Sequence, residues 1–219
     1  MEYYKLRSKC KREYDYILTL FITNEISLLL TWMLSKSRAT PNQISITSII
    51  SGFLCCLCYS AGWFIAGSIF LFISHLLDCT DGNLARAKEM FSPFGRWLDF
   101  ITDRLIEIFI FLGTSFYYYN TNETLLWVIL PFIDSVFLLF YYYIVDVSLS
   151  LGISEQKQNI TSLRFKGILI KWGLFEPVIY GFIILAPFGL LKFQIISVLF
   201  ITILGLIYQA YKNYKRLTK

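Results

Sequence analysis

Long apolar segments separated by short polar turns are the feature that most constrains the fold of this chain. Hydrophobic residues make up 56% of the 219 residues and charged residues only 16%, a balance that is not that of a soluble domain. An apolar stretch of about twenty residues is long enough to cross a lipid bilayer as a helix. The sequence therefore predicts an all-α integral membrane protein with six transmembrane helices. The expected spans are 42–60, 63–86, 94–118, 125–148, 167–186 and 191–211.

Residues 1–41 are predicted to form a cytoplasmic N-terminal arm that precedes a six-helix domain of residues 42–219. The arm is basic at both ends, and polar residues interrupt its apolar part. We interpret residues 14–37 as an amphipathic helix that lies in the membrane interface. The alternative, that this segment is a true first span, stays open. Thr40-Pro41 follows as a helix start, since proline is favoured in the first turn.

Lysine and arginine are distributed asymmetrically, although the net charge is only +5. Nearly all of them lie in or close to the N-terminal arm, the turn at 87–93, the loop at 149–166 and the C-terminal tail. The turns expected on the opposite side, at 61–62, 120–124 and 187–190, carry neither residue, and Lys192 is the exception to the pattern. Because positive charge stays on the cytoplasmic side, the pattern predicts a multi-pass protein of a plasma or inner membrane with both termini in the cytoplasm. A chain this apolar is not expected to bind nucleic acid.

Four carboxylates interrupt the apolar pattern at the cytoplasmic ends of the second and third expected spans. Asp78 and Asp81 are three residues apart, and Asp99 and Asp103 are four apart, so on helices each pair lies on one face. Two helices that each offer two carboxylates would form a site for hard divalent cations. Oxygen ligands alone suit Mg²⁺ or Mn²⁺ rather than zinc. The alternative is a pair of helices whose acids are solvated at the membrane surface.

These acids belong to a longer pattern, D-x-x-D-G-x-x-A-R, then eight residues, then G-x-x-x-D-x-x-x-D. The pattern resembles the signature of the CDP-alcohol phosphotransferases, the class I CDP-alcohol phosphatidyltransferase family. Every fixed position is filled between Asp78 and Asp103, and a chance match has a probability of about 10⁻¹⁰ per start site at average residue usage. The resemblance implies a six-helix bundle with a polar cavity that opens to the cytoplasm.

The resemblance also implies a reaction, in which a CDP-alcohol donates its phosphoryl-alcohol portion to a hydroxyl acceptor and CMP is released. Asp78, Asp81, Asp99 and Asp103 would hold two Mg²⁺ or Mn²⁺ ions, and Asp103 would also accept the proton of the acceptor. The other fixed positions would bind the CDP moiety. They are Gly82, Ala85, Arg86 and Gly95.

The sequence does not name the acceptor alcohol. Arg96, Arg104, Arg164 and Lys166 are candidates for binding an acceptor that carries phosphate, and contact with lipid headgroups is the alternative. We expect CDP-diacylglycerol as the donor, a role in phospholipid biosynthesis, membrane lipids as neighbours and a homodimer. The N-terminal arm weakly resembles a branch whose donor and acceptor are both polar, such as inositol phosphates. A cation transporter is the alternative from another class, but it would place its acids along a path through the bilayer.

Overall fold

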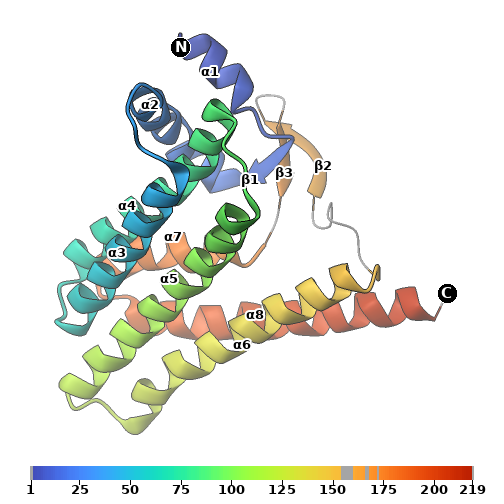
Figure 1. The fold of residues 1–219 in the computed structure, drawn as a ribbon. Coiled ribbons are helices and arrows are strands. Elements are labelled where there is room, and N and C mark those ends of the chain that lie inside the picture. Colours follow the sequence, from blue (N-terminus) through green and yellow to red (C-terminus); the bar gives the residue numbers. More distant parts are fainter. Residues whose placement is uncertain (1, 154–159, 166–167, 172, 219) are drawn as a thin grey trace.

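The computed structural model describes residues 2–153, 160–165, 168–171 and 173–218, with only the backbone of 160–165. Figure 1 shows a bundle of long helices with a small sheet and two short helices gathered at one end. The α-helices of the described residues are α1 (Tyr3–Lys9), α2 (Asn24–Ser35), α3 (Pro41–Ser60), α4 (Phe64–Lys88), α5 (Pro93–Asn120), α6 (Leu125–Ser150), α7 (Phe175–Leu185) and α8 (Leu191–Leu217). The other elements are the strands β1 (Tyr14–Tyr16), β2 (Ile160–Phe165) and β3 (Ile168–Lys171), the π-helical η1 (Thr19–Thr23) and the 3₁₀-helical η2 (Ala186–Phe188).

Four of the described helices are long and apolar enough to cross a membrane, namely α3, α4, α6 and α8. Their bounds lie close to the spans expected from the sequence, and the prediction of a helical membrane protein is confirmed at this level. The helix α5 is longer than any of these four, with 28 residues. It does not meet the same criterion because Asp103, Arg104 and Glu107 interrupt its apolar sequence.

Residues 167–186 do not form one continuous helix, and this part of the prediction was wrong. Ile168–Lys171 forms β3, and α7 contains only 11 residues. With a rise of about 1.5 Å per residue, α7 is roughly half as long as the ~30 Å hydrocarbon core of a bilayer. The reason is local: the segment before Gly173 pairs as a strand, and a new helix begins at Phe175 with Pro177 in its first turn, where proline is tolerated.

The prediction of one helix over residues 14–37 was also wrong for its first residues. Tyr14–Tyr16 forms β1, which pairs in parallel with β3, and the N–H of Leu169 donates to the carbonyl of Glu13 at 3.0 Å. The helical part begins as η1 and continues as α2, while α1 was not predicted. Strand β2, in the expected loop 149–166, pairs antiparallel with β3. The sheet thereby ties the N-terminal arm to the connection between α6 and α7 (Figure 1).

Small residues allow α3, α4 and α5 to pack closely. A Cβ placed on Gly113 of α5 would lie 2.6 Å from the carbonyl oxygen of Cys56 on α3. The hydroxyl of Ser48 donates to the carbonyl of Ser74, and Ser74 donates in return to the carbonyl of Ser48, both at 2.8 Å. Such close contact between backbones, together with hydrogen bonds between helices, stabilises helix pairs in an apolar solvent.

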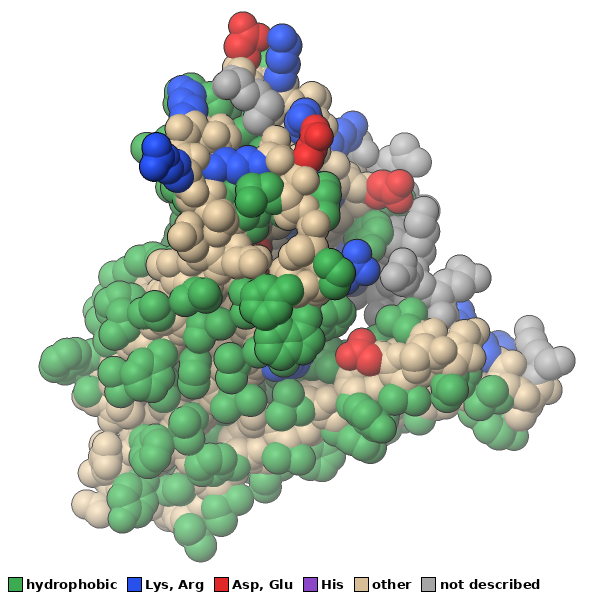
Figure 2. Space-filling view, viewed as in Figure 1, with side chains coloured by type: hydrophobic (Ala, Val, Ile, Leu, Met, Phe, Trp, Pro, Cys, Tyr) green, Lys and Arg blue, Asp and Glu red, His purple; other side chains and the backbone are tan. Residues whose placement is uncertain are grey.

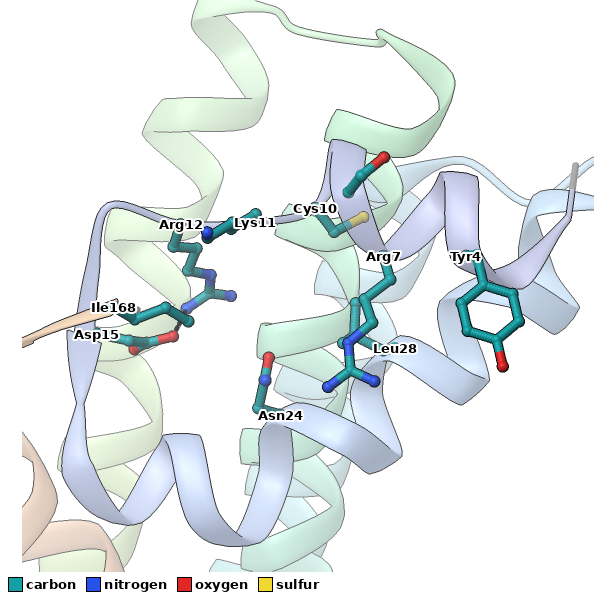
Figure 3. Close-up of a pocket in the computed structure, with 10 residues that line it drawn as sticks. Tyr4, Arg7, Cys10, Lys11, Arg12, Asp15, Asn24, Leu28 and Ile168 are labelled. Carbon is teal, nitrogen blue, oxygen red and sulfur yellow. Dashed lines mark hydrogen bonds and ion pairs between the residues drawn. The ribbon is translucent and has the colours of Figure 1, made fainter. Parts of the chain in front are cut away.

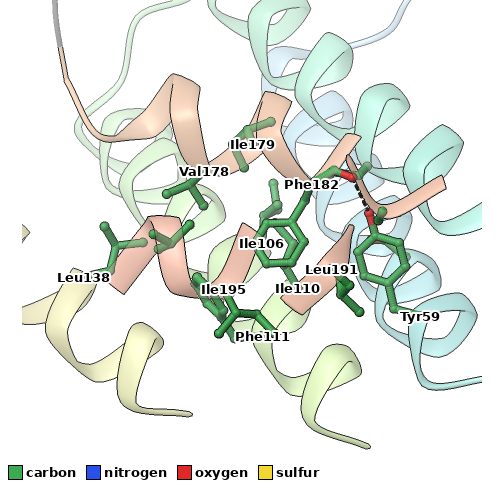
Figure 4. Close-up of a cluster of buried hydrophobic side chains, with 14 of the residues drawn as sticks. Tyr59, Ile106, Ile110, Phe111, Leu138, Val178, Ile179, Phe182, Leu191 and Ile195 are labelled. Atoms are coloured by element: carbon green, nitrogen blue, oxygen red, sulfur yellow. Dashed lines mark hydrogen bonds between the residues drawn. The ribbon is translucent and has the colours of Figure 1, made fainter. Parts of the chain in front are cut away.

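A second layer is held together by a buried apolar cluster that surrounds α7 (Figure 4). Phe182 packs edge-on against Phe111, and its carbonyl accepts a hydrogen bond from Tyr59 at 3.1 Å. On the face in Figure 2, hydrophobic side chains cover the helices of the lower part, and most charged side chains gather at the end that carries α1. The bundle therefore presents an apolar body with one polar end.

Candidate active site

The four aspartates lie at the polar end of the bundle, at the end of α4 and the beginning of α5. Carboxylate oxygens of Asp78, Asp81 and Asp99 lie within 4.8 Å of one another. Because α4 and α5 both pack against α3, the aspartates of the two helices meet at this end of the bundle, each pair on one face of its helix. Asp103 follows one turn after Asp99, and its side chain is about one-third exposed. We refer to these four residues as the four-aspartate site.

The oxygens of this site are suited to a cation. The hydroxyl of Ser45 on α3 donates to Asp81 at 2.5 Å, which fixes that carboxylate. Asp78 Oδ1 is buried and finds no hydrogen-bond partner among the described residues. A buried carboxylate oxygen without a donor is costly, and a bound cation would satisfy it. A set of ligands that contains only carboxylates fits Mg²⁺ or Mn²⁺.

The residues expected to bind CDP lie beside the aspartates on the last turns of α4. Arg86 donates to the side-chain oxygen of Asn83 at 2.7 Å, and Asn83 in turn donates to Ser27 of α2 at 3.0 Å. A Cβ placed on Gly82 would meet only the guanidinium of Arg86, at 3.6 Å. Gly82 is therefore not required by the packing of helices, and it leaves a methyl-sized space beside the guanidinium of Arg86. Ala85 lies in the same turns.

Gly95 lies where α5 begins and faces the beginning of α3. Its N–H donates to the hydroxyl of Ser92 at 2.9 Å, which caps α5. A Cβ on Gly95 would come within 3.2 Å of the side-chain oxygen of Asn42. A larger residue here would therefore press on the side chains of Ser92 and Asn42, where the beginnings of α5 and α3 meet near the four-aspartate site.

Arg104 is held by two partners next to Asp103. Its guanidinium pairs with Glu107 at 2.9 Å and lies over the ring of Tyr142 of α6, 3.5 Å from the ring centroid. Tyr142 also donates to Glu107 at 3.1 Å, and Glu107 is buried. The carboxylate of Asp103 is 3.7 Å from the other side of the guanidinium. Arg104 therefore has a fixed orientation at the inner edge of the site.

The other three residues expected to bind the acceptor are not brought to the site by any described side-chain contact. Arg96 is exposed on the first turn of α5. The backbone of Arg164 pairs with Leu169 within the sheet, and its side chain is not among the described ones. Lys166 lies outside the described residues.

Two basic residues of the sheet region reach the site instead. Arg12 pairs with Asp15 at 2.8 Å and is close enough to Asp78 for the two charges to interact. Burial lowers the pKa of Lys171 from its usual range, and the negative charges of Asp15 and Asp103 oppose this shift. Sequence reasoning did not single out Arg12, because the N-terminal arm reaches α4 through contacts between distant segments, such as the hydrogen bond from the Cys10 thiol to the carbonyl of Asn83 and the pairing of β1 with β3.

Comparison with known sequences identifies the family. The sequence model of the CDP-alcohol phosphatidyltransferases matches residues 38–208, which include all four aspartates. The chain belongs to this family. The CDP-alcohol phosphatidyltransferase signature recognised in the sequence thus lies within a match that covers most of the chain.

Curated members of the family match this chain over shorter regions. The phosphatidylinositol phosphate synthase of Cutibacterium acnes is 30% identical over 95 residues, which are 43% of this chain and 46% of the relative. The archaetidylinositol phosphate synthase of Pyrococcus horikoshii is 37% identical over 86 residues, or 37% of this chain and 44% of the relative. The aligned part of the chain spans less than half the length of these two relatives.

Solved structures of the family share the fold. The phosphatidylinositol phosphate synthase of Mycobacterium tuberculosis with CDP-DAG bound superposes with a TM-score of 0.69 at 18% identity, over 87% of this chain and 94% of that one. The same enzyme in complex with manganese and citrate gives a TM-score of 0.67 at 19% identity, over 88% and 89% of the two chains. At such low sequence identity, the structural similarity establishes the fold alone.

Proposed function

We propose that this chain transfers a phosphatidyl group from CDP-diacylglycerol to a hydroxyl acceptor and releases CMP, as a step of phospholipid biosynthesis. The observation that carries the proposal is the convergence of Asp78, Asp81 and Asp99 beside the space that Gly82 leaves under Arg86. Membership of the family and the fold shared with an enzyme that was solved with CDP-DAG support it.

The acceptor that we propose is a phosphorylated polyol of the inositol phosphate type. The names of the Cutibacterium acnes and Pyrococcus horikoshii relatives both refer to inositol phosphate products. Arg104 and Lys171 would provide positive charge for such an acceptor next to Asp103. A polar donor remains the second candidate, because a relative from Aquifex aeolicus, named as a bifunctional IPC transferase and DIPP synthase, is 36% identical over 78 residues.

Each residue of the site would have its own role in the reaction. Two Mg²⁺ or Mn²⁺ ions held by the four aspartates would neutralise the diphosphate of the donor and stabilise the departing CMP. Arg86 would bind a phosphate of the donor by charge-assisted hydrogen bonds. Asp103 would take the proton of the acceptor hydroxyl as that hydroxyl attacks the β-phosphorus. Arg104 would orient the acceptor, since Glu107 and Tyr142 hold its guanidinium in place.

The membrane arrangement that we propose keeps both termini in the cytoplasm and six passes of the chain. Five are the long helices α3, α4, α5, α6 and α8, and the other is the shorter apolar segment Phe175–Phe188, in which α7 continues into η2 and which is buried against the neighbouring helices. Support comes from the asymmetric distribution of basic residues. The proposed interfacial segment is now α2, whose exposed Ile26, Leu29 and Met33 lie at helical spacing. The homodimer stays a prediction.

The experiment that tests the function is an assay of the purified protein with labelled donors. CDP-diacylglycerol and a CDP-linked polar alcohol are each combined with a panel of acceptors that includes inositol phosphate, free inositol and glycerol phosphate. We expect CMP release and a labelled lipid product with CDP-diacylglycerol and a phosphorylated polyol. Product from the polar donor alone would favour the second candidate, and no CMP release with any donor would contradict both.

A further inference from the structure

A cavity of about 320 Å³ lies between the N-terminal arm, α2 and β3 (Figure 3). Its walls come from segments that are far apart in the sequence: α1 and the following arm, the beginning of α2, and Ile168 of β3. The pairing of β1 with β3 therefore completes the cavity. We call it the arm pocket. A volume of this size lies in the range of pockets that bind small molecules.

The arm pocket is lined by more positive than negative charge. Arg7, Lys11 and Arg12 line it, whereas Asp15 is the one carboxylate among its lining residues. Arg7 pairs with Glu25 at 2.7 Å and Arg12 with Asp15 at 2.8 Å. Lys11 has no ion pair among the described residues and lies exposed at the rim. This excess of positive charge among the lining side chains attracts an anion.

Donors remain available inside the pocket. Arg12 uses one terminal nitrogen for Asp15, and its Nε is buried without a hydrogen-bond partner among the described residues. A buried donor with no acceptor costs about 1–3 kcal/mol, so a ligand oxygen that accepts from it would be favoured. The side-chain amide of Asn24 adds a neutral polar group to the same wall, and Leu28 forms an apolar part of it (Figure 3).

The arm pocket is separate from the four-aspartate site. Its lining includes none of the four aspartates and none of the residues expected to bind CDP. Cys10 stands between the two, with its thiol donating to the carbonyl of Asn83 at 3.3 Å on α4. Arg12 is the link, because it lines the pocket and also interacts with the charge of Asp78.

We propose that the arm pocket binds a phosphate group, held by Lys11 together with Arg7 and Arg12. A phosphate has several oxygens and a charge near −2, so it can accept from two arginines and a lysine at once. The group can belong to a soluble phosphorylated molecule or to the headgroup of an anionic lipid, because the chemistry that the pocket recognises is the same. The proposal concerns binding alone and does not rest on the transfer reaction.

The test uses the full chain purified in detergent and compares Lys11→Gln and Arg7→Gln with Lys5→Gln. Lys5 lies on α1, as Arg7 does, and it is exposed but does not line the pocket. Its replacement therefore removes one positive charge outside the pocket. Inorganic phosphate is the soluble probe, and the measurement is the dissociation constant from calorimetry. We expect Lys11→Gln and Arg7→Gln to weaken phosphate binding about tenfold, the ratio for one lost charge-assisted hydrogen bond, and Lys5→Gln to leave it unchanged.

A second arm of the experiment distinguishes the two sources of phosphate. The same variants are reconstituted in vesicles of phosphatidylcholine with and without phosphatidic acid, and the gain in thermal stability from the anionic lipid is measured. An effect of Lys11→Gln only with inorganic phosphate indicates a soluble ligand, an effect only with phosphatidic acid indicates a lipid headgroup, and an effect in both arms shows that the pocket takes phosphate from either source. If the pocket variants behave like Lys5→Gln in both arms, the proposal is wrong.

Discussion

Replacement of Gly82 by alanine should weaken the binding of the donor without lowering the stability of the fold. The added methyl group would meet no atom closer than 3.6 Å, and what it meets is the flexible end of Arg86. In a helix interior, alanine is favoured over glycine by about 0.5–1 kcal/mol. Gly82→Ala should therefore keep or raise the thermal stability of the protein.

The same methyl group would lie against the guanidinium of Arg86, which is proposed to bind a phosphate of the donor, and would crowd that contact. If it displaces a single charge-assisted contact of about 1.5 kcal/mol, the apparent affinity for CDP-diacylglycerol falls about tenfold. Gly113→Ala is the matched control. Its methyl would lie 2.6 Å from a backbone oxygen of α3, so we expect a loss of about 1–3 kcal/mol in stability.

The assay combines thermal unfolding in detergent with the KM for CDP-diacylglycerol in mixed micelles. We expect Gly82→Ala to raise KM about tenfold without lowering the melting temperature, and Gly113→Ala to lower the melting temperature. A Gly82→Ala protein with the KM of the wild type would refute the proposal that Arg86 binds the donor here. A lowered melting temperature for Gly82→Ala would refute the reading that the glycine is free of packing contacts.

Three further predictions concern the metal, the contacts that hold Arg104, and the membrane topology. Excess chelator should abolish transfer and Mg²⁺ or Mn²⁺ should restore it, since clustered carboxylates repel each other without a cation; activity that persists in chelator would contradict the metal site. Tyr142→Phe should lower kcat several-fold and stability by about 1 kcal/mol, because Glu107, which pairs with Arg104, loses the hydrogen bond from the Tyr142 hydroxyl; wild-type kinetics would contradict a role of this hydrogen bond in orienting Arg104. Reporters fused after Asn122 and after Lys157 should report opposite sides of the membrane, and a report from the same side would overturn the six-span arrangement.

The sequence was sufficient to predict elements whose signal is local. The long helices have continuous apolar stretches with clear ends, such as the capping box in which Thr40 and Gln43 bond to each other's backbone. The acids were found because their spacing of three and four residues matches the helical repeat. The pairing of Arg104 with Glu107 has the same kind of spacing and could have been found in this way.

What could not be predicted depends on contacts between distant segments. The pairing of β1 with β3 joins residues more than 150 positions apart, and no local pattern in Tyr14–Tyr16 indicates its partner. That pairing replaces part of two expected helices with strands. Together with contacts of the arm on α4, such as that of Cys10 with Asn83, it places Arg12 near the four-aspartate site. Close contacts such as Tyr142 over Arg104 likewise arise from the packing of α6 on α5.

The central claim, direct transfer at the four-aspartate site with Asp103 as the proton acceptor, is tested most directly by Asp103→Asn. The measurement is turnover of CDP-diacylglycerol to CMP together with binding of the donor, with Asp146→Asn as the control because that aspartate is exposed on α6. We predict that Asp103→Asn binds the donor as the wild type does and loses turnover by a factor of about 10² or more, the scale of a lost general base, whereas Asp146→Asn keeps its activity. Wild-type turnover in Asp103→Asn, or a phosphatidyl-aspartate trapped on the chain, would contradict the account.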